Sequence, residues 1–142
     1  MTGGWVAGLV VPTAAPVVLL ALAVLVVRRR FTIATVRGIS MTPTFADGTR
    51  VLAVRRAEYR PGEVIVFRIR RTARRDLKWR IKRVAAGPGD PVPSWMPGGA
   101  GAVPPGHVLV SGDNPRSQDS RELGYIPHAR IAGRVVRVLP HS

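Results

Sequence analysis

The chain has 142 residues, no cysteine, and a formal net charge of +14, from 22 Lys plus Arg against 8 Asp plus Glu. This length allows one compact domain with one appendage, and the lack of cysteine excludes disulfides and thiolate metal sites. Only two of the basic residues are lysines, Lys78 and Lys82. Arginine stays protonated in proteins, whereas a desolvated lysine can lose its proton near neutral pH, so the lysines are the candidates for base chemistry.

The N-terminal segment is apolar and uncharged from Met1 to Val27. As a helix, the stretch from Trp5 to Val27 would span about 34 Å, enough to cross a hydrocarbon core of ~30 Å. A cleaved signal peptide is the alternative, but the segment has neither a basic start nor a small-residue cleavage pattern. We therefore expect a retained transmembrane anchor with a basic flank in residues 1–30, and a separate domain in residues 31–142.

Beyond the anchor, the pattern is short and strand-like. Runs of β-branched and aromatic residues, separated by Gly, Pro, Asp and Asn turns, predict strands over residues 31–36, 51–54, 64–69, 79–84, 108–110 and 131–139. No helical period follows Val27. We therefore expect a mainly β domain, a small barrel-like or sandwich-like arrangement. The stretch from Pro91 to Gly106 is rich in Pro and Gly and predicts a loop that contacts membrane or substrate.

Ser40 lies in a distinctive local sequence, Gly38-Ile39-Ser40-Met41-Thr42-Pro43-Thr44. The glycine permits a close backbone approach before the serine, and the proline restricts the chain after it. This arrangement favours an exposed hydroxyl, with the Ser40 backbone N–H directed at a developing oxyanion. An ordinary turn serine is the alternative for this motif taken alone.

Lys82 lies in the middle of a predicted strand, in the sequence Ile81-Lys82-Arg83-Val84. If its side chain points inward, burial lowers its pKa and favours the neutral amine. Such an amine can serve as the base for a serine nucleophile without histidine. The alternative is an exposed lysine in a basic region.

A third block, from Gly112 to Arg121, is too polar for a core segment. A serine hydroxyl there could orient the lysine, and an Asp/Arg pair could hold the loop. The three histidines are scattered without metal-ligand spacing, so we expect neither a metal site nor a cofactor.

Together, and in this order, the three blocks resemble the type I signal peptidases, the S26 family of serine endopeptidases. The trailing turn Gly87-Pro88-Gly89-Asp90 and the stretch Val103-Pro104-Pro105-Gly106 strengthen the resemblance. It implies a β catalytic domain in which Ser40 is the nucleophile and its backbone N–H binds the oxyanion. Lys82 would be the general base. Many bacterial members of the family carry Ser or Thr at the position of Gly38, and that side chain gives a second oxyanion donor. With Gly38, this chain lacks the second donor.

The resemblance also implies roles for supporting residues. Ser117, or alternatively Ser120, would orient the lysine, and a structural loop would be held by Asp113, Asp119 and Arg121. Shallow pockets for small substrate residues at −1 and −3 would be formed by Ala34, Val36, Gly38, Met41, Phe45 and Ile81.

The implied function is a membrane-bound endopeptidase that removes signal peptides from exported preproteins. Its partners would be preprotein signal peptides and membrane lipids, with no nucleic acid. The single anchor implies a single-pass protein of the plasma membrane. Signal-peptide cleavage requires its catalytic domain on the extracytoplasmic side. The positive-inside rule applied to Arg28–Arg30 favours the opposite topology, and we give the motifs precedence.

Two alternative functions stay open. One is a maturation peptidase dedicated to one or few client precursors. The other, from a different class, is a membrane-tethered module that binds RNA or anionic lipid through the arginine-rich segment 68–83.

Overall fold

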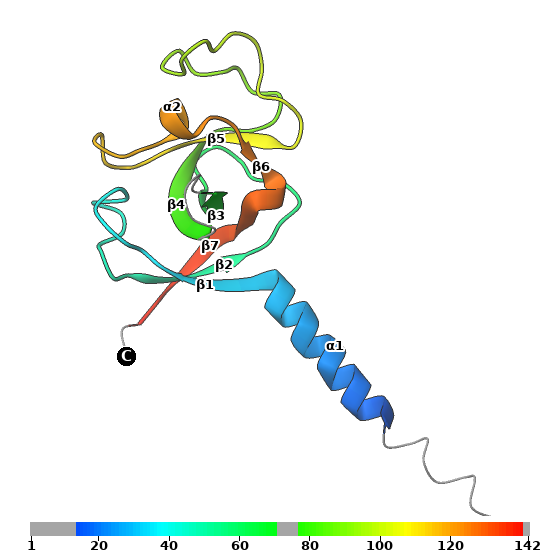
Figure 1. Cartoon of the computed structure of the whole chain (residues 1–142). Coiled ribbons are helices and arrows are strands. Elements are labelled where there is room, and N and C mark those ends of the chain that lie inside the picture. Colours follow the sequence, from blue (N-terminus) through cyan, green and yellow to red (C-terminus); the bar gives the residue numbers. More distant parts are fainter. Residues whose placement is uncertain (1–13, 71–76, 141–142) are drawn as a thin grey trace, which may run out of the picture. The chain divides into compact units, whose positions relative to one another are not determined.

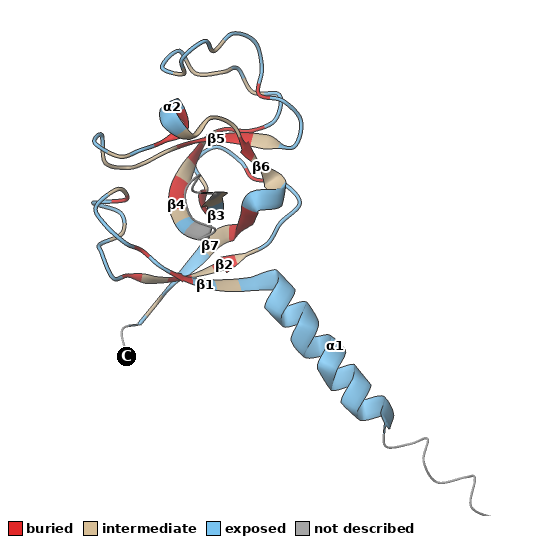
Figure 2. Ribbon diagram, in the orientation of Figure 1, coloured by how far each residue is buried: buried red, intermediate tan, exposed pale blue. Residues whose placement is uncertain are grey.

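The computed structural model describes residues 14–70 and 77–140. The chain divides into two compact units, Met1–Arg30 and Phe31–Ser142. In the first unit, helix α1 (Ala14–Arg30) is apolar until it reaches Arg28, and its described residues are exposed (Figure 2). Across residues 14–70 and 77–140, no helix is both long enough and apolar enough to cross a membrane. The structure therefore does not support the expected transmembrane helix, whose predicted first part lies outside the described residues.

The second unit is a seven-stranded antiparallel sheet, so the predicted mainly β fold is confirmed (Figure 1). Its strand order is β1-β2-β7-β3-β4-β5-β6. The strands are β1 (Phe31–Thr35), β2 (Arg50–Val54), β3 (Val64–Arg70), β4 (Leu77–Ala86), β5 (His107–Ser111), β6 (Ile126–Pro127) and β7 (Ile131–Leu139).

Three short elements between β5 and β7 were not predicted from the sequence. They are the single-turn helix α2 (Ser120–Leu123), strand β6 and the 3-10 turn η1 (His128–Arg130). Each has only two to four residues, so no hydrophobic period can develop within it. Tertiary contacts and the Asp119 cap define these elements.

Buried side chains lie on both faces of β3. Val64 and Val66 point into one hydrophobic cluster, which also contains Ala34, Val36, Met41, Val51, Ala53, Ile81 and Ala132. Ile65 and Phe67 point into a second cluster, which also contains Tyr59, Val84, Val108, Val110, Ile126 and Ile131. Because strand side chains alternate, the continuous apolar run of β3 supplies both clusters.

Strand β1 and the first half of β4 each have a backbone edge without a strand partner among the described residues. Strand β1 pairs only with β2. Strand β4 pairs with β5 only from Arg83 onward, so within the described strands its first half has β3 as its sole neighbour. These edges can accept a further extended segment.

The stretch from Pro91 to Gly106 folds back on itself. Val92 N–H donates to the Gly101 carbonyl at 2.9 Å, next to an isolated bridge between Pro91 and Ala102. Val92 and Met96 then pack against a small third cluster beneath the loop, formed by Ala86, Val103 and Leu109. The expected contact of this loop with membrane or substrate stays a prediction.

Candidate active site

Ser40 lies in the loop that joins β1 to β2. The base of this loop is closed by two hydrogen bonds, from Val36 N–H to Thr49 O at 2.8 Å and from Gly48 N–H to Val36 O at 2.9 Å. Gly38 takes a positive φ of 79°, a conformation that disfavours any side chain. Its N–H donates to Asp47 Oδ1 at 2.7 Å, which fixes the turn just before the serine.

The peptide bond that carries the Ser40 N–H is also fixed. Thr42 N–H donates to the Ile39 carbonyl at 3.0 Å. The Ile39 carbonyl and the Ser40 N–H belong to the same trans peptide and point in opposite directions, so this bond also fixes the direction of the Ser40 N–H. Within the described residues, the Ser40 N–H itself donates to no protein acceptor. It is therefore available to a ligand oxygen.

A cleft of about 540 Å³ opens beside Ser40, between the end of β1 and the first half of β4. Its walls come from Ile33, Ala34, Thr35, Val36, Arg37, Ser40, Trp79, Arg80 and Ile81. Three of the predicted pocket residues, Ala34, Val36 and Ile81, thus lie in one cleft with Ser40.

The other three predicted pocket residues lie elsewhere. Met41 is fully buried in the first hydrophobic cluster, and Phe45 packs against the same cluster. Gly38 lies in the turn before Ser40 and does not line the cleft. Met41 and Phe45 thus belong to the hydrophobic cluster, and the pocket that the resemblance implied contains Ala34, Val36 and Ile81 of the six predicted residues.

Lys82 is only 1 % exposed. It pairs with Ile65 on β3, and strand alternation places its side chain on the face of β4 that also carries Val84. Its amine is buried and has no hydrogen-bond partner within the part of the chain that the structure describes. An unpaired ammonium is costly in such surroundings, and this environment favours the neutral amine.

Burial lowers the pKa of Lys82 from 10.5 to about 8. The positive charge of Arg80 adds to this effect, while the carboxylates of Asp119, Asp113 and Glu122 oppose it. With a pKa near 8, roughly one-fifth of the molecules carry the neutral amine at pH 7.4. An ordinary lysine would be neutral in only about one molecule in a thousand at that pH.

Asp113 connects three segments that are distant in the sequence. Arg83 on β4 donates to both of its carboxylate oxygens, at 2.8 Å from Nε and 2.6 Å from Nη2. The Thr44 hydroxyl, in the loop that carries Ser40, donates to the same carboxylate at 2.5 Å. These bonds, led by the one from Arg83, hold the pKa of Asp113 below its ordinary value.

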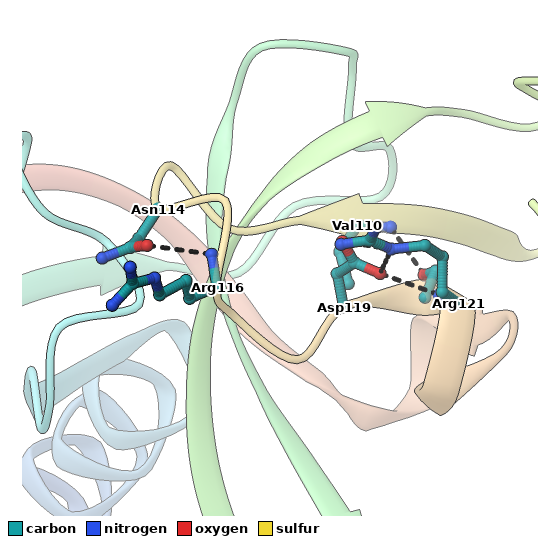
Figure 3. Close-up of polar contacts among 6 residues, drawn as sticks. Val110, Asn114, Arg116, Asp119 and Arg121 are labelled. Carbon is teal, nitrogen blue, oxygen red and sulfur yellow. Dashed lines mark hydrogen bonds and ion pairs between the residues drawn. The ribbon is translucent and has the colours of Figure 1, made fainter. Parts of the chain in front are cut away.

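The loop from β5 to α2 is held by a second acidic residue (Figure 3). Asp119 caps α2 by accepting the Arg121 N–H at 2.9 Å, and it also forms an ion pair with the Arg121 guanidinium at 2.9 Å. Burial opposes ionisation of Asp119, but the bonds from Arg121 outweigh it and lower the pKa. In the same loop, Asn114 Oδ1 accepts the Arg116 N–H at 2.9 Å.

The two candidate lysine-orienting serines differ in their bonding. The fully buried Ser120 hydroxyl accepts the Val110 N–H at 2.8 Å. The Ser117 hydroxyl is buried without a hydrogen-bond partner among the described residues, as is the Lys82 amine. Ser117 therefore has free hydrogen-bonding capacity, whereas Ser120 already serves the β5 backbone.

Gly112 brings the Ser117 loop against the Ser40 loop. A Cβ atom at position 112 would lie 1.8 Å from the Ser117 hydroxyl oxygen and 2.7 Å from the Ser40 carbonyl oxygen. Asn114 N–H donates to that same carbonyl at 3.1 Å. Only glycine leaves room for this approach, so the Ser40 block and the block from Gly112 to Arg121 meet here.

Sequence reasoning missed three contributors to the site. Arg83 follows Lys82 directly and bonds Asp113, whereas Arg37 and Arg80 line the cleft. A signal for Arg80 was available, because Arg80 lies two residues before Lys82, and residues two apart on a strand share a face. The size of the arginine-rich run concealed it.

Comparison with known families gives one finding. The family model described as signal peptidase, peptidase S26 matches residues 10–94 and 92–139. The matched ranges include both loops of the site and the strands on which the cleft is built.

Proposed function

The chain belongs to the signal peptidase S26 family and is therefore a peptidase of the kind that cleaves signal peptides, and from this membership we propose a specific mechanism. Ser40 is the nucleophile, Lys82 is the general base, and cleavage follows small residues at −1 and −3. One observation carries the proposal: the Lys82 amine is buried and unpartnered, with its pKa lowered to about 8.

The reaction proceeds in two halves. The neutral Lys82 amine accepts the Ser40 hydroxyl proton as the Ser40 oxygen attacks the carbonyl carbon of the scissile peptide bond. The resulting Lys82 ammonium returns that proton to the leaving amine, and an acyl-enzyme remains. Water then gives a proton to the same lysine as its oxygen attacks the carbonyl carbon of the ester. The bond between that carbon and the Ser40 oxygen breaks, the lysine returns the proton to the Ser40 oxygen, and the leader peptide leaves with a terminal carboxylate.

The oxyanion formed in each half accepts a hydrogen bond from the Ser40 backbone N–H. Two observations support this role: the donor has no acceptor among the described residues, and the Thr42-to-Ile39 hydrogen bond fixes its peptide plane. Gly38 offers no hydroxyl as a second donor, so the backbone of this loop carries the oxyanion stabilisation.

The substrate lies extended in the cleft, between the free edges of β1 and β4. Such a segment makes backbone hydrogen bonds in the manner of an added strand. The apolar walls formed by Ala34, Val36 and Ile81 favour small apolar residues over long ones.

Ser117 orients the Lys82 amine in the reacting enzyme, although in the described structure the two groups form no hydrogen bond with each other. The free capacity of both buried groups supports this pairing, and the engagement of Ser120 with Val110 argues against the alternative. Replacing Ser117 with alanine should lower kcat and shift the pH profile, whereas a purely structural serine would leave the pH profile unchanged.

We further propose that the N-terminal segment anchors the protein in the plasma membrane, as a single-pass protein with its domain on the extracytoplasmic side. The exposed apolar side chains of α1 and its charge-free sequence before Arg28 support an apolar environment for this helix. The location of signal-peptide cleavage supports the side.

The test is cleavage of an A-x-A preprotein by the full chain reconstituted in lipid. Wild type should cut at the A-x-A site, and both Ser40→Ala and Lys82→Met should abolish cleavage. Lys78→Met makes the same chemical change elsewhere on β4, and Ser94→Ala removes an exposed loop hydroxyl. Both control variants should retain cleavage.

Survival of activity in Lys82→Met would refute the proposed base. Cleavage of one precursor but not of unrelated A-x-A preproteins would instead favour the dedicated maturation peptidase.

A further inference from the structure

The cleft beside Ser40 contains two cationic side chains among otherwise neutral walls. Arg37 follows β1 and Arg80 lies on β4, and both line the cleft together with Ser40. A site that accepts only small apolar residues has no use for two guanidinium groups. Their presence indicates that the occupant carries a negative charge.

Arg80 lacks the hydrogen bonds that its guanidinium needs. Its Nε atom is buried with no partner among the described residues, and its Nη2 has one long contact of 3.5 Å, to Gln118 Oε1. A buried donor left without an acceptor is unfavourable, and an acceptor supplied by a ligand relieves this.

Three of the protein's carboxylates form ion pairs with arginines outside the cleft. Over residues 14–70 and 77–140, ion pairs join Arg83 to Asp113, Arg121 to Asp119 and Arg134 to Glu63. Neither Arg37 nor Arg80 takes part in one. Asp47, near Arg37 in sequence, accepts the Gly38 N–H, and no carboxylate among the described residues lines the cleft with the two arginines.

We propose that Arg80, assisted by Arg37, binds a carboxylate of the peptide in the cleft and makes this peptidase selective for an acidic group near the scissile bond. This inference rests on the proposed function, because it assumes that the cleft holds the substrate. Guanidinium groups bind carboxylates through paired, charge-assisted hydrogen bonds. The carboxylate comes either from an Asp or Glu side chain of the substrate or from the new C-terminus of the cleaved leader peptide.

The first experiment measures kcat/KM of the lipid-reconstituted full chain on matched peptide substrates. Each pair differs only by Asp or Asn at one position on either side of the scissile bond. We expect wild type to prefer Asp about tenfold at one position, the size expected of a partly exposed charge-assisted hydrogen bond. The preference should shrink as ionic strength rises.

Variants assign the preference to the cleft. Arg80→Gln should reduce the Asp/Asn ratio to near one, Arg80→Lys should keep part of it, and Arg37→Gln should weaken it. Arg130→Gln removes the same charge at an exposed position outside the cleft and should leave the ratio unchanged. Partial retention in Arg80→Lys would show that the loss in Arg80→Gln is not misfolding.

The second experiment separates the two carboxylate sources without cleavage. The Ser40→Ala full chain is titrated with a leader peptide that ends in a free carboxylate and with the same peptide as its terminal amide. Tighter binding of the acid than of the amide, lost in Ser40→Ala/Arg80→Gln, would assign the terminal carboxylate. Equal binding of the two peptides with an Asp preference in cleavage would assign the side chain.

The two proposals fail in different ways. Cleavage of neutral A-x-A substrates with no acid preference in either experiment would overturn the inference and leave the proposed function intact. The peptides could also resist cleavage while the acid binds more tightly than the amide in an Arg80-dependent way. That result would support carboxylate binding in the cleft and refute the proposed function. An acid preference unchanged by Arg80→Gln would overturn the role of this arginine.

Discussion

Replacing Lys82 with methionine should abolish cleavage and at the same time stabilise the fold. Methionine is close to lysine in length and has no charge, so it can fill the space of the buried side chain without placing an ammonium group in it. The wild-type amine is fully enclosed and unpartnered. Replacing such a group with an apolar one removes its desolvation cost.

The size of the effect follows from the pKa. The Lys82 pKa is 10.5 when unperturbed and about 8 in the folded protein. At 1.36 kcal/mol for each unit of difference, the protonated form costs the folded state about 3 kcal/mol. The folded pKa is the lower one, so this cost is fully present below pH 8 and disappears as the pH rises toward 10.5.

The measurement is the free energy of unfolding of the full chain in detergent, for wild type and Lys82→Met, at pH 7 and pH 10. We expect the variant to exceed wild type by about 3 kcal/mol at pH 7 and by less than about 1 kcal/mol at pH 10. Comparing the two proteins at each pH cancels the titration of the other groups. Lys78→Met serves as the control for the loss of one positive charge.

Two results would refute this reasoning. A Lys82→Met protein less stable than wild type at pH 7 would mean that the amine has a partner in the folded state. A stability difference independent of pH would mean that the lysine stays protonated up to its ordinary pKa, and the proposed base would then be absent.

Three further predictions concern the site. The value of kcat/KM should rise about tenfold per pH unit below pH 8 and level off above it. Arg80→Gln should move this pH profile to higher pH, because the Arg80 charge lowers the Lys82 pKa. A pH profile that the variant leaves unchanged would contradict this coupling. Gly112→Ala should lose most activity while the protein stays folded, because the new Cβ displaces the Ser117 or the Ser40 loop, and kinetics together with circular dichroism test this. Asp113→Asn should lower the free energy of unfolding by about 2 kcal/mol, because Arg83 loses a partly buried carboxylate, and urea titration measures the loss.

The sequence allowed the sheet to be predicted because its strands carry strong β-branched runs between glycine and proline turns. The run Val64-Ile65-Val66-Phe67 illustrates both the strength and the limit of this approach. Its composition indicated a strand buried on both faces, but no local pattern says which cluster each residue joins. The two clusters are a property of the folded chain.

The site was predictable to a similar extent. The local sequences around Ser40 and Lys82 pointed to their chemistry, but the burial of the Lys82 amine depends on segments far along the chain. Arg37 gave no signal within a strongly basic sequence, and the signal for Arg80, its shared strand face with Lys82, was concealed by the arginine-rich run. The resemblance implied that Met41 forms part of the pocket, whereas its long apolar side chain packs into the hydrophobic cluster.

The carboxylate of Asp113 has a consequence for the order in which the enzyme becomes active. Its partners Thr44 and Arg83 precede it by 69 and 30 residues, and the Ser117 loop follows it. Contacts over such separations form late in folding, because long loops must close first. Ser40 and Lys82 also leave the ribosome before the segment that assembles them, and we expect the nascent chain to stay inactive until the segment with Asp113 and Ser117 has been made.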